Sequence, residues 1–222
     1  MSGKKAIKYP GENVDVYWNG RLCIHIGECG RAKGELFTTG RKPWCDPNLA
    51  TNDEVEDVVK RCPTGALHYE IKDGSGAEKA DAENTIHVAY NGPLYVRGNV
   101  SIDGAPGNVP GLAFRAALCR CGQSGNKPFC DNSHEKAGFK DYGAVGDRGS
   151  KLEESGGELK VSPRTDGPLL VKGNVKISSG SGRTAWEGTQ VALCRCGASA
   201  NKPFCDGSHT KIGFKAEEGS QD

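Results

Sequence analysis

Residues 119–134 read CRCGQSGNKPFCDNSH, and residues 194–209 read CRCGASANKPFCDGSH. Both stretches space three cysteines and one histidine as C-x-C-x8-C-x3-H. Three thiolates and one imidazole can hold either one tetrahedral zinc ion or two irons bridged by sulfide, and the spacing alone leaves both open. The candidate ligands are Cys119, Cys121, Cys130 and His134 in the first stretch and Cys194, Cys196, Cys205 and His209 in the second.

The two stretches belong to a longer internal repeat. Residues 92–140 and 167–215 align without gaps at an offset of 75 positions, and 28 of the 49 aligned residues are identical. Each copy opens with Gly-Pro and then alternates apolar and polar residues, which is the period-2 pattern of a half-buried strand. A turn rich in small residues and a short apolar segment lead into the cysteines. We therefore expect a strand, a loop and a metal site in each copy.

The residues just before each histidine, an aspartate and a serine, suit the N-terminal turn of a short helix. Such a helix would present His134 or His209, and its free N–H groups would face an anionic thiolate–sulfide cluster. The two copies differ in this turn, because Asn132 stands where the second copy has Gly207. If the position needs a positive φ, asparagine is the least costly alternative to glycine.

The pattern C-x-C-x2-S-x3-P-x-C-D-G-S-H resembles the signature of the CDGSH iron–sulfur proteins, the family of mitoNEET. It covers both copies, with CDNSH as the one departure in the first. The resemblance implies one [2Fe-2S] cluster per motif, held by the three cysteines and the histidine named above. It also implies a tandem member of the family, in which an internal pseudo-twofold and a shared β-cap replace a dimer of single-motif chains. We accordingly expect a monomer.

The remaining four cysteines lie in the first third of the chain. Cys23 and Cys29 have the outer spacing of a ferredoxin C-x2-C-x2-C run, with Ile26 at its middle position, and Cys62-Pro63 provides a distal Cys-Pro. A capped helix is expected to begin near residue 51 and to carry Cys62 on its buried face. Residues 14–18 and 66–71 are predicted to be paired strands. The outline is a small α+β ferredoxin-like domain.

The run VDVYWNGRLCIHIGEC…RKPWCDP…RCPTGALHY is similar to divergent single-cluster ferredoxin domains. This resemblance implies one cubane-type cluster on Cys23, Cys29 and Cys62. Three ligands suit a [3Fe-4S] cluster, whereas a fourth ligand permits [4Fe-4S]. Cys45 is the first candidate for the fourth ligand, and His25 is the second.

Together these patterns predict an α+β chain, in which a ferredoxin-like α+β domain precedes two mainly-β CDGSH units. The expected ferredoxin-like domain covers residues 13–71, the CDGSH units cover 85–140 and 159–216, and residues 72–84 and 141–158 are linkers.

Composition and charge exclude several classes of function. The 29 Lys and Arg nearly balance the 28 Asp and Glu, for a net charge of +1, so no overall charge attracts nucleic acid or an anionic membrane. No apolar run is long enough to span a bilayer, and residues 1–10 lack the apolar segment of a secretion signal. We expect a cytoplasmic protein, in which clustered cysteines are metal ligands or redox groups rather than disulfides.

The sequence contains no nucleophile elbow, phosphate-binding loop or dinucleotide fingerprint, so we do not expect an enzyme. The leading hypothesis is one-electron transfer from the three clusters to redox partner proteins. The second hypothesis is a carrier that donates an intact [2Fe-2S] cluster to apo iron–sulfur proteins. The third is an interaction module in which zinc has only a structural role.

Overall fold

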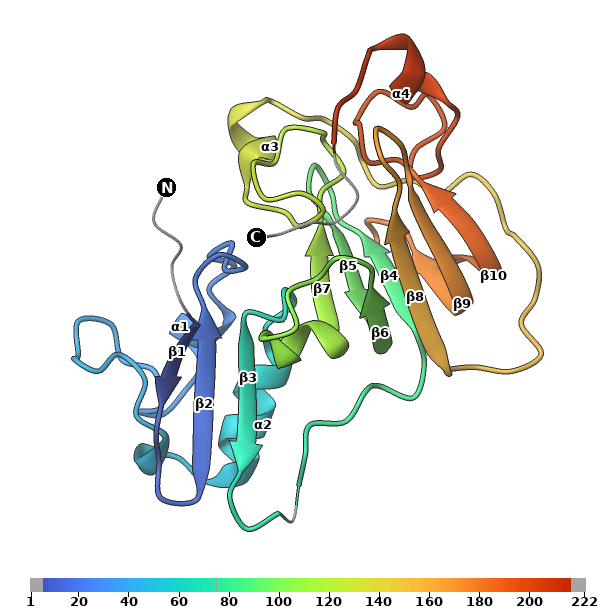
Figure 1. Ribbon diagram of the computed structural model, residues 1–222. Helices are drawn as coiled ribbons and strands as arrows, with labels where there is room; N and C mark the ends of the chain where they lie inside the picture. Colours follow the sequence, from blue (N-terminus) through green and yellow to red (C-terminus); the bar gives the residue numbers. More distant parts are fainter. Residues whose placement is uncertain (1–5, 75, 217–222) are drawn as a thin grey trace.

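The N-terminal part of the chain forms a three-stranded antiparallel sheet with a helix packed against it (Figure 1). The computed structural model describes residues 6–74 and 76–216. The sheet has the order β1 (Ala6–Tyr9), β2 (Val14–Asn19) and β3 (Leu67–Ile71). Between β2 and β3 the chain forms α1 (Glu28–Arg31), the 3-10 turn η1 (Pro47–Leu49) and α2 (Asn52–Arg61).

The local structure of this part follows from its sequence. The Thr51 side chain accepts a hydrogen bond from the Glu54 N–H, and the Glu54 carboxylate accepts one from the Thr51 N–H, which is a complete capping box for α2. The apolar face of α2 is buried against the sheet, and the helix ends at the Cys62-Pro63 pair. The predicted pairing of residues 14–18 with 66–71 is confirmed, with Val16 opposite Tyr69.

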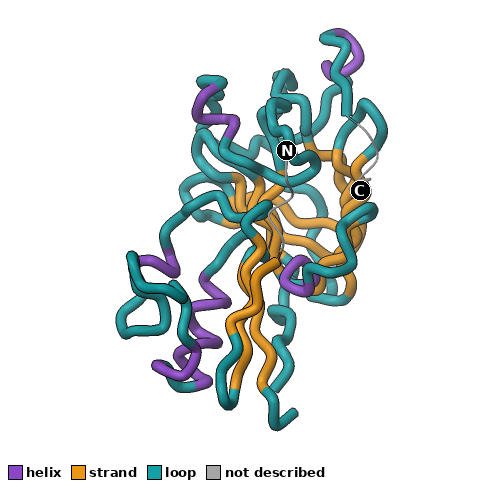
Figure 2. Tube along the Cα trace, turned by 60° about the vertical axis from the view of Figure 1, so that its left-hand side comes forward, coloured by secondary structure: helices purple, strands orange, loops and turns teal. Residues whose placement is uncertain are grey.

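The rest of the chain builds a seven-stranded mixed sheet. Its strands are β4 (Thr85–Val88), β5 (Leu94–Arg97), β6 (Asn99–Ile102), β7 (Arg115–Leu118), β8 (Glu158–Pro163), β9 (Leu169–Ser178) and β10 (Thr184–Leu193). Their order is β6-β8-β9-β4-β5-β7, and β10 pairs with β9. The helical pieces are short: η2 (Pro110–Ala113), α3 (Ser133–Lys136) and α4 (Ser208–Lys211). In Figure 2 the strands run through the middle of the molecule and the short helices lie toward its periphery.

The two repeats are joined by reciprocal strand pairing. The strand that precedes the aligned residues of the first repeat, β4, runs parallel to β9 of the second repeat, with Thr85 opposite Lys176. The strand that precedes the aligned residues of the second repeat, β8, runs parallel to β6 of the first repeat, with Ser101 opposite Lys160. Thr85 and Lys160 are 75 positions apart, and so are Ser101 and Lys176. This separation is the offset of the repeat, so the two pairings are equivalent. Each of these two strands thus pairs on one side with the repeat that follows it and on the other side with the other repeat.

The predicted period-2 alternation is confirmed by the burial of these strands. Leu94, Val96, Val100 and Ile102 are buried, and the residues between them in the two strands are partly or fully exposed. In the second repeat, Leu169, Val171, Val175 and Ile177 are 0% exposed. These side chains from both repeats form one hydrophobic core.

The two connecting segments pack on the sheets. In residues 72–84 the Glu78 carboxylate is buried, bonds to His68 Nδ1 of β3 at 2.9 Å and pairs with Arg115 of β7. Residue 75 of this expected linker lies outside the described residues. In residues 141–158, Val145 is buried and Ser150 N–H donates to the Glu187 carbonyl oxygen at 2.8 Å. Both segments are therefore anchored to the domains that they connect.

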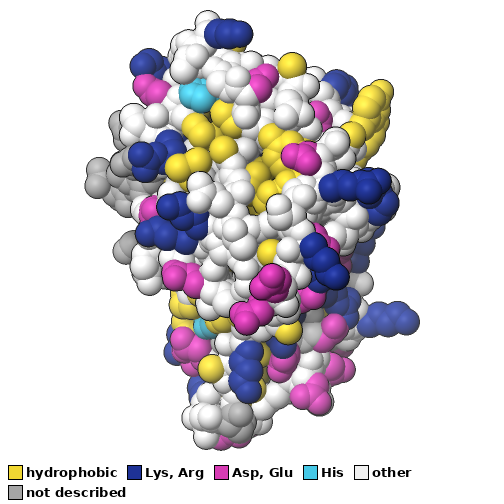
Figure 3. All heavy atoms as spheres, turned by 90° about the vertical axis from the view of Figure 1, so that its right-hand side faces the viewer, with side chains coloured by type: hydrophobic (Ala, Val, Ile, Leu, Met, Phe, Trp, Pro, Cys, Tyr) yellow, Lys and Arg dark blue, Asp and Glu magenta, His cyan; other side chains and the backbone are white. Residues whose placement is uncertain are grey.

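In the described residues no helix is both long enough and apolar enough to cross a membrane. On the face that Figure 3 shows, Lys and Arg are interspersed with Asp and Glu. Hydrophobic side chains gather in the upper part of that face, toward the end of the molecule that carries α3 and α4 in Figure 1.

Candidate metal centres

In the first repeat, main-chain hydrogen bonds bring Cys119 and Cys130 together from either side of a loop. Cys119 follows directly after β7, and its N–H donates to the Pro128 carbonyl oxygen at 2.8 Å. Cys130 N–H donates to the Ala117 carbonyl oxygen at 2.8 Å. The loop between them is closed by Ser124, whose Oγ donates to the Phe129 carbonyl oxygen at 2.6 Å. The second repeat has the same bonds from Cys194, Cys205 and Ser199.

The four candidate ligands of the first motif form two pairs. Cys119 Sγ and Cys121 Sγ lie 3.8 Å apart, and Cys130 Sγ lies 3.4 Å from His134 Nδ1. Two thiolates on one tetrahedral metal, with bonds of about 2.3 Å, are about 3.8 Å apart, and a thiolate and an imidazole are about 3.5 Å apart. Each pair therefore has the spacing of two ligands on a single metal.

The second motif repeats this geometry. Cys194 Sγ and Cys196 Sγ lie 3.7 Å apart, and Cys205 Sγ lies 3.4 Å from His209 Nδ1. Within residues 6–74 and 76–216 no three His, Cys, Asp or Glu side chains converge on one point. The residues of both motifs fit a group that contains two metals, with one pair of ligands on each.

A short helix presents each histidine, as the sequence predicts. Asp131 Oδ1 accepts from Ser133 N–H at 3.0 Å, and its Oδ2 accepts from Gly125 N–H at 2.8 Å, so this aspartate ties the helix to the loop. These bonds, together with others, lower the pKa of Asp131 although burial alone raises it. Asn132 has φ +68° and Gly207 has φ +82°, so this position of the turn is left-handed in both motifs.

In the first motif the electrostatics favour the thiolate form of one cysteine, Cys121, over that of its neighbours. The hydrogen bond between the two thiols lowers the pKa of Cys121 to about 7 and raises the pKa of Cys119. Burial raises the pKa of Cys130 to about 12. Gln123 N–H donates to Cys121 Sγ at 3.4 Å and Asn132 N–H donates to Cys130 Sγ at 3.5 Å. Main-chain donors thus already point at the sulfurs that a cationic metal would bind.

The two motifs lie directly against each other. A Cβ on Gly122 would be 2.4 Å from the Cys196 carbonyl oxygen, and a Cβ on Gly197 would be 2.7 Å from the Cys121 carbonyl oxygen. Both glycines have positive φ, +79° and +84°. The absence of a side chain at these two positions lets the two cysteine loops touch.

Two buried arginines are structural residues of these sites that sequence reasoning missed. Arg120 and Arg195 are each 1% exposed and occupy the middle position of each C-x-C. Arg120 Nε donates to the Gly92 carbonyl oxygen at 3.0 Å, and Arg195 Nε donates to the Gly167 carbonyl oxygen at 3.1 Å. Each arginine ties its motif to the Gly-Pro that opens the repeat. Arginine occupies the equivalent position in both copies, and this repetition was the signal in the sequence that could have identified the two residues.

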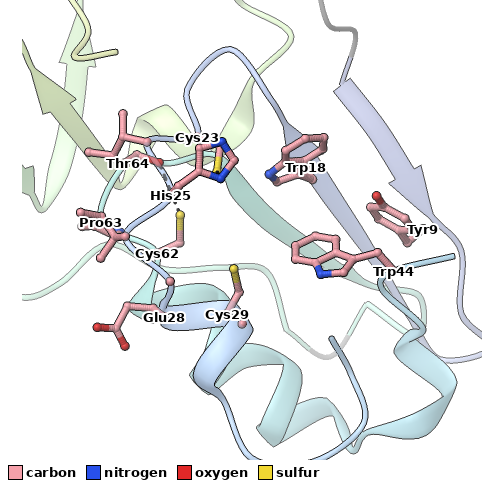
Figure 4. A pocket seen from close by; sticks show the side chains of 14 residues that line it. Tyr9, Trp18, Cys23, His25, Glu28, Cys29, Trp44, Cys62, Pro63 and Thr64 are labelled. Carbon is pink, nitrogen blue, oxygen red and sulfur yellow. Dashed lines mark hydrogen bonds between the residues drawn. The ribbon is translucent and has the colours of Figure 1, made fainter. Parts of the chain in front are cut away.

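In the N-terminal domain three cysteines line one pocket of about 460 Å³ (Figure 4). Cys23 comes from the loop after β2, Cys29 from α1, and Cys62 from the end of α2. Burial raises the pKa of Cys29, and the charges of Cys62 and Cys23 raise it further. The structure therefore brings together the three cysteines that the sequence placed at this site.

The two candidates for a fourth ligand lie in different environments. His25 lines the pocket, and its Nδ1 is 3.9 Å from Cys23 Sγ. Cys45 is not among the residues that line the pocket; it is 0% exposed and packs in the core with Val14 and Leu36. Burial raises the pKa of Cys45 to about 12. The sequence could not separate these cases, because burial of a lone cysteine leaves no local pattern.

Known families match the three segments that contain these residues. The family described as "Divergent 4Fe-4S mono-cluster" matches residues 9–72, and the family described as "Iron-binding zinc finger CDGSH type" matches residues 91–135 and 166–210. The chain is an iron–sulfur protein, and three of its segments match iron–sulfur or iron-binding families. It belongs to the tandem CDGSH proteins that carry an N-terminal divergent ferredoxin-like domain.

Curated relatives match a smaller part of the chain. "Uncharacterized protein YjdI" of Escherichia coli strain K12 is 45% identical over 64 residues, which are 29% of this chain and 84% of that relative. The protein of the same name from Escherichia coli O157:H7 matches over the same length with the same identity. No solved structure matches this chain.

Proposed function

We propose that this chain is a one-electron transfer protein that holds two [2Fe-2S] clusters and one cubane-type cluster. The observation that carries the proposal is the placement of three cysteine-lined sites in one chain, with the two CDGSH loops in contact through Gly122 and Gly197. Iron–sulfur clusters take up and release single electrons at potentials set by their ligands and surroundings. Adjacent clusters allow an electron to pass between them and then to a redox partner protein.

For each CDGSH motif the proposed ligands are those that the sequence predicts, three cysteines and one histidine. The pair distances support two irons rather than one zinc, because each pair has the spacing of two ligands on its own metal. One iron would lie between the two cysteines of the C-x-C. The other would lie between the third cysteine and the histidine.

For the N-terminal site we propose Cys23, Cys29 and Cys62 as ligands. Three cysteines complete a [3Fe-4S] cluster, and a [4Fe-4S] cluster needs one ligand more. His25 is the better candidate of the two, because it lines the pocket whereas Cys45 is enclosed in the apolar core. Substitution His25→Ala would then convert a [4Fe-4S] signal into a [3Fe-4S] signal. An unchanged EPR signal would exclude His25 as the ligand.

The reciprocal pairing of β4 with β9 and of β6 with β8 supports an internal pseudo-twofold and a shared β-cap. Since both halves of this arrangement come from one chain, we propose that the protein acts as a monomer. The domain boundaries that we propose remain those expected from the sequence, 13–71, 85–140 and 159–216, with connecting segments 72–84 and 141–158.

A cluster carrier is the second candidate, and the uneven exposure of the ligands favours it. Cys119 and Cys194 are each 1% exposed, whereas His134 and His209 lie partly exposed on helices of four residues. Each motif therefore has one enclosed side and one side that solvent or an acceptor protein reaches. A cluster that is to be donated intact would leave from the histidine side.

The test starts from anaerobically purified protein. Iron, zinc and acid-labile sulfide are measured, and EPR spectra are recorded before and after dithionite. About seven or eight irons per chain with reversible reduction would support electron transfer. Clusters that cannot be reversibly reduced would overturn it, and zinc without sulfide would leave only the structural role. Incubation with an apo-ferredoxin then separates the two candidates, since a carrier gives up its clusters and an electron-transfer protein keeps them.

A further inference from the structure

The first CDGSH motif is hydrogen-bonded to the N-terminal domain through two asparagine side chains. Asn132 Nδ2 donates to the Ile24 carbonyl oxygen at 2.6 Å, and Asn126 Nδ2 donates to the Arg21 carbonyl oxygen at 3.0 Å. Ile24 lies between Cys23 and His25, and all three residues line the N-terminal pocket. The loop of one candidate centre is therefore bonded directly to the ligand turn of another.

Apolar packing reinforces this contact. Ile24 is 3% exposed and packs with Ala117 and Cys130, and Tyr95 packs against the same group. Cys130 is a candidate ligand of the first motif, and Ile24 belongs to the loop that lines the N-terminal pocket. The Ile24 side chain therefore lies between the two sites. In Figure 1 the loop after β2 rises toward the end of the molecule that carries α3.

The second motif has no counterpart of this bond, because Gly207 stands at the position of Asn132. A Cβ at Gly207 would meet nothing within 4 Å, so the turn around it is open. The first motif is thus flanked by the N-terminal loop through Asn132 and by the second motif through Gly122. The single departure from the CDGSH signature occurs where the N-terminal domain docks.

We propose that Asn132 is a positioning residue that holds the N-terminal site against the first CDGSH site. The first CDGSH site is then the middle one of three centres in series. The inference rests on the proposed electron-transfer function. With clusters bound at both sites, a reduced N-terminal centre would pass one electron to the oxidised first CDGSH centre and would itself be oxidised, with no bond made or broken. An external one-electron donor restores the N-terminal centre. The second CDGSH centre is then the terminal one.

The test compares Asn132→Gly with Gly207→Asn in the full-length, cluster-loaded chain. Asn132→Gly gives the first motif the turn of the second, so it removes the amide without straining a left-handed position. Gly207→Asn places the same amide in open space and is the matched control. Asn132→Asp is a third variant, which keeps the side-chain size and replaces the donor by an acceptor.

Two readouts are followed in each variant. Hydrogen exchange of the amides in residues 21–27 is expected to accelerate about two- to tenfold in Asn132→Gly, the factor that one net hydrogen bond contributes. EPR power saturation of the reduced protein reports the magnetic interaction between the N-terminal centre and the first CDGSH centre, and this interaction is expected to weaken. Asn132→Asp should follow Asn132→Gly in both readouts, and Gly207→Asn should match the wild type.

Unchanged exchange and saturation in Asn132→Gly would overturn the proposal. Equal acceleration in Gly207→Asn would also overturn it, because the effect would then not come from the contact with Ile24. Failure of the proposed function is distinguishable: clusters that accept no electrons would exclude the relay, while hydrogen exchange would still report whether Asn132 holds the loop.

Discussion

Gly122 of the first motif packs against the carbonyl oxygen of Cys196 in the second, at a distance that leaves no room for a side chain. We expect Gly122→Ala to separate the two loops, because its Cβ would lie 2.4 Å from that oxygen. The left-handed strain and the overlap together should cost about 2–5 kcal/mol in the free energy of unfolding. Chemical denaturation measures the loss.

Gly138→Ala is the matched control for this prediction. Gly138 has φ +62°, and a Cβ at this position would meet nothing within 4 Å, so the substitution adds left-handed strain without an overlap. It should cost only about 1–2 kcal/mol. Equal destabilisation by the two substitutions would show that the contact between the motifs contributes nothing.

Cys45→Val should leave the N-terminal cluster in place. The Cys45 side chain is enclosed in the core and does not line the pocket, so the slightly larger apolar valine should replace it at a packing cost of about 1–3 kcal/mol without loss of the cluster. Cys62→Ser, at the pocket itself, should remove the iron of that cluster. Iron and sulfide analysis distinguishes the two variants. If Cys45→Val lost as much iron as Cys62→Ser, Cys45 would be a ligand.

Glu78 links the connecting segment 72–84 to the N-terminal domain through His68 and to the first CDGSH unit through Arg115. Burial raises the pKa of Glu78, but its bonds to His68 and Arg115 lower it more, so the folded-state pKa lies below the ordinary value. Glu78→Gln would leave the Arg115 guanidinium without its counterion and should cost about 3–5 kcal/mol at pH 7. Asp81→Asn, which removes a partly exposed partner of Arg97, should cost at most about 1 kcal/mol.

The same pair predicts a dependence of stability on pH. Because the pKa of Glu78 is lower in the folded state, its contribution is fully present above the unfolded-state value of about 4.3 and is lost as the pH falls through the folded-state value. The His68 imidazole lies between Glu78 and Glu70, with nitrogens 2.9 Å and 4.0 Å from their carboxylate oxygens. Urea unfolding between pH 7 and pH 3 should show a steeper loss for the wild type than for Glu78→Gln. Parallel curves would contradict this assignment.

The capping box of α2 should contribute to holding Cys62 in place. Thr51→Ala removes the acceptor for the Glu54 N–H and should cost about 0.5–2 kcal/mol in the free energy of unfolding. Thr38→Ala is a suitable control, because the Thr38 hydroxyl is exposed and makes only a 3.5 Å contact with the Glu35 carbonyl oxygen. Thermal unfolding of both variants measures the difference. A Thr38→Ala loss as large as that of Thr51→Ala would argue against the cap.

Features that depend on neighbours in the sequence could be predicted from it. The capped helix that leads to Cys62, the alternation of Leu94 and Val96, and the left-handed Asn132 each follow from side-chain preferences within a few residues. The eight cysteines and histidines of the two repeats could be recognised because the loop that holds them is short and its spacing is constrained by the bonds of one site.

By itself, then, the sequence determined the local elements, the repeat and the sets of candidate ligands. Only the tertiary structure decided which segments meet: β4 with β9, Glu78 with Arg115, and Asn132 with Ile24 across 108 positions. It also placed Cys45 in the core and His25 in the pocket. These outcomes depend on how apolar surfaces from distant segments pack and on which buried polar groups find partners, and neither leaves a local pattern in the chain.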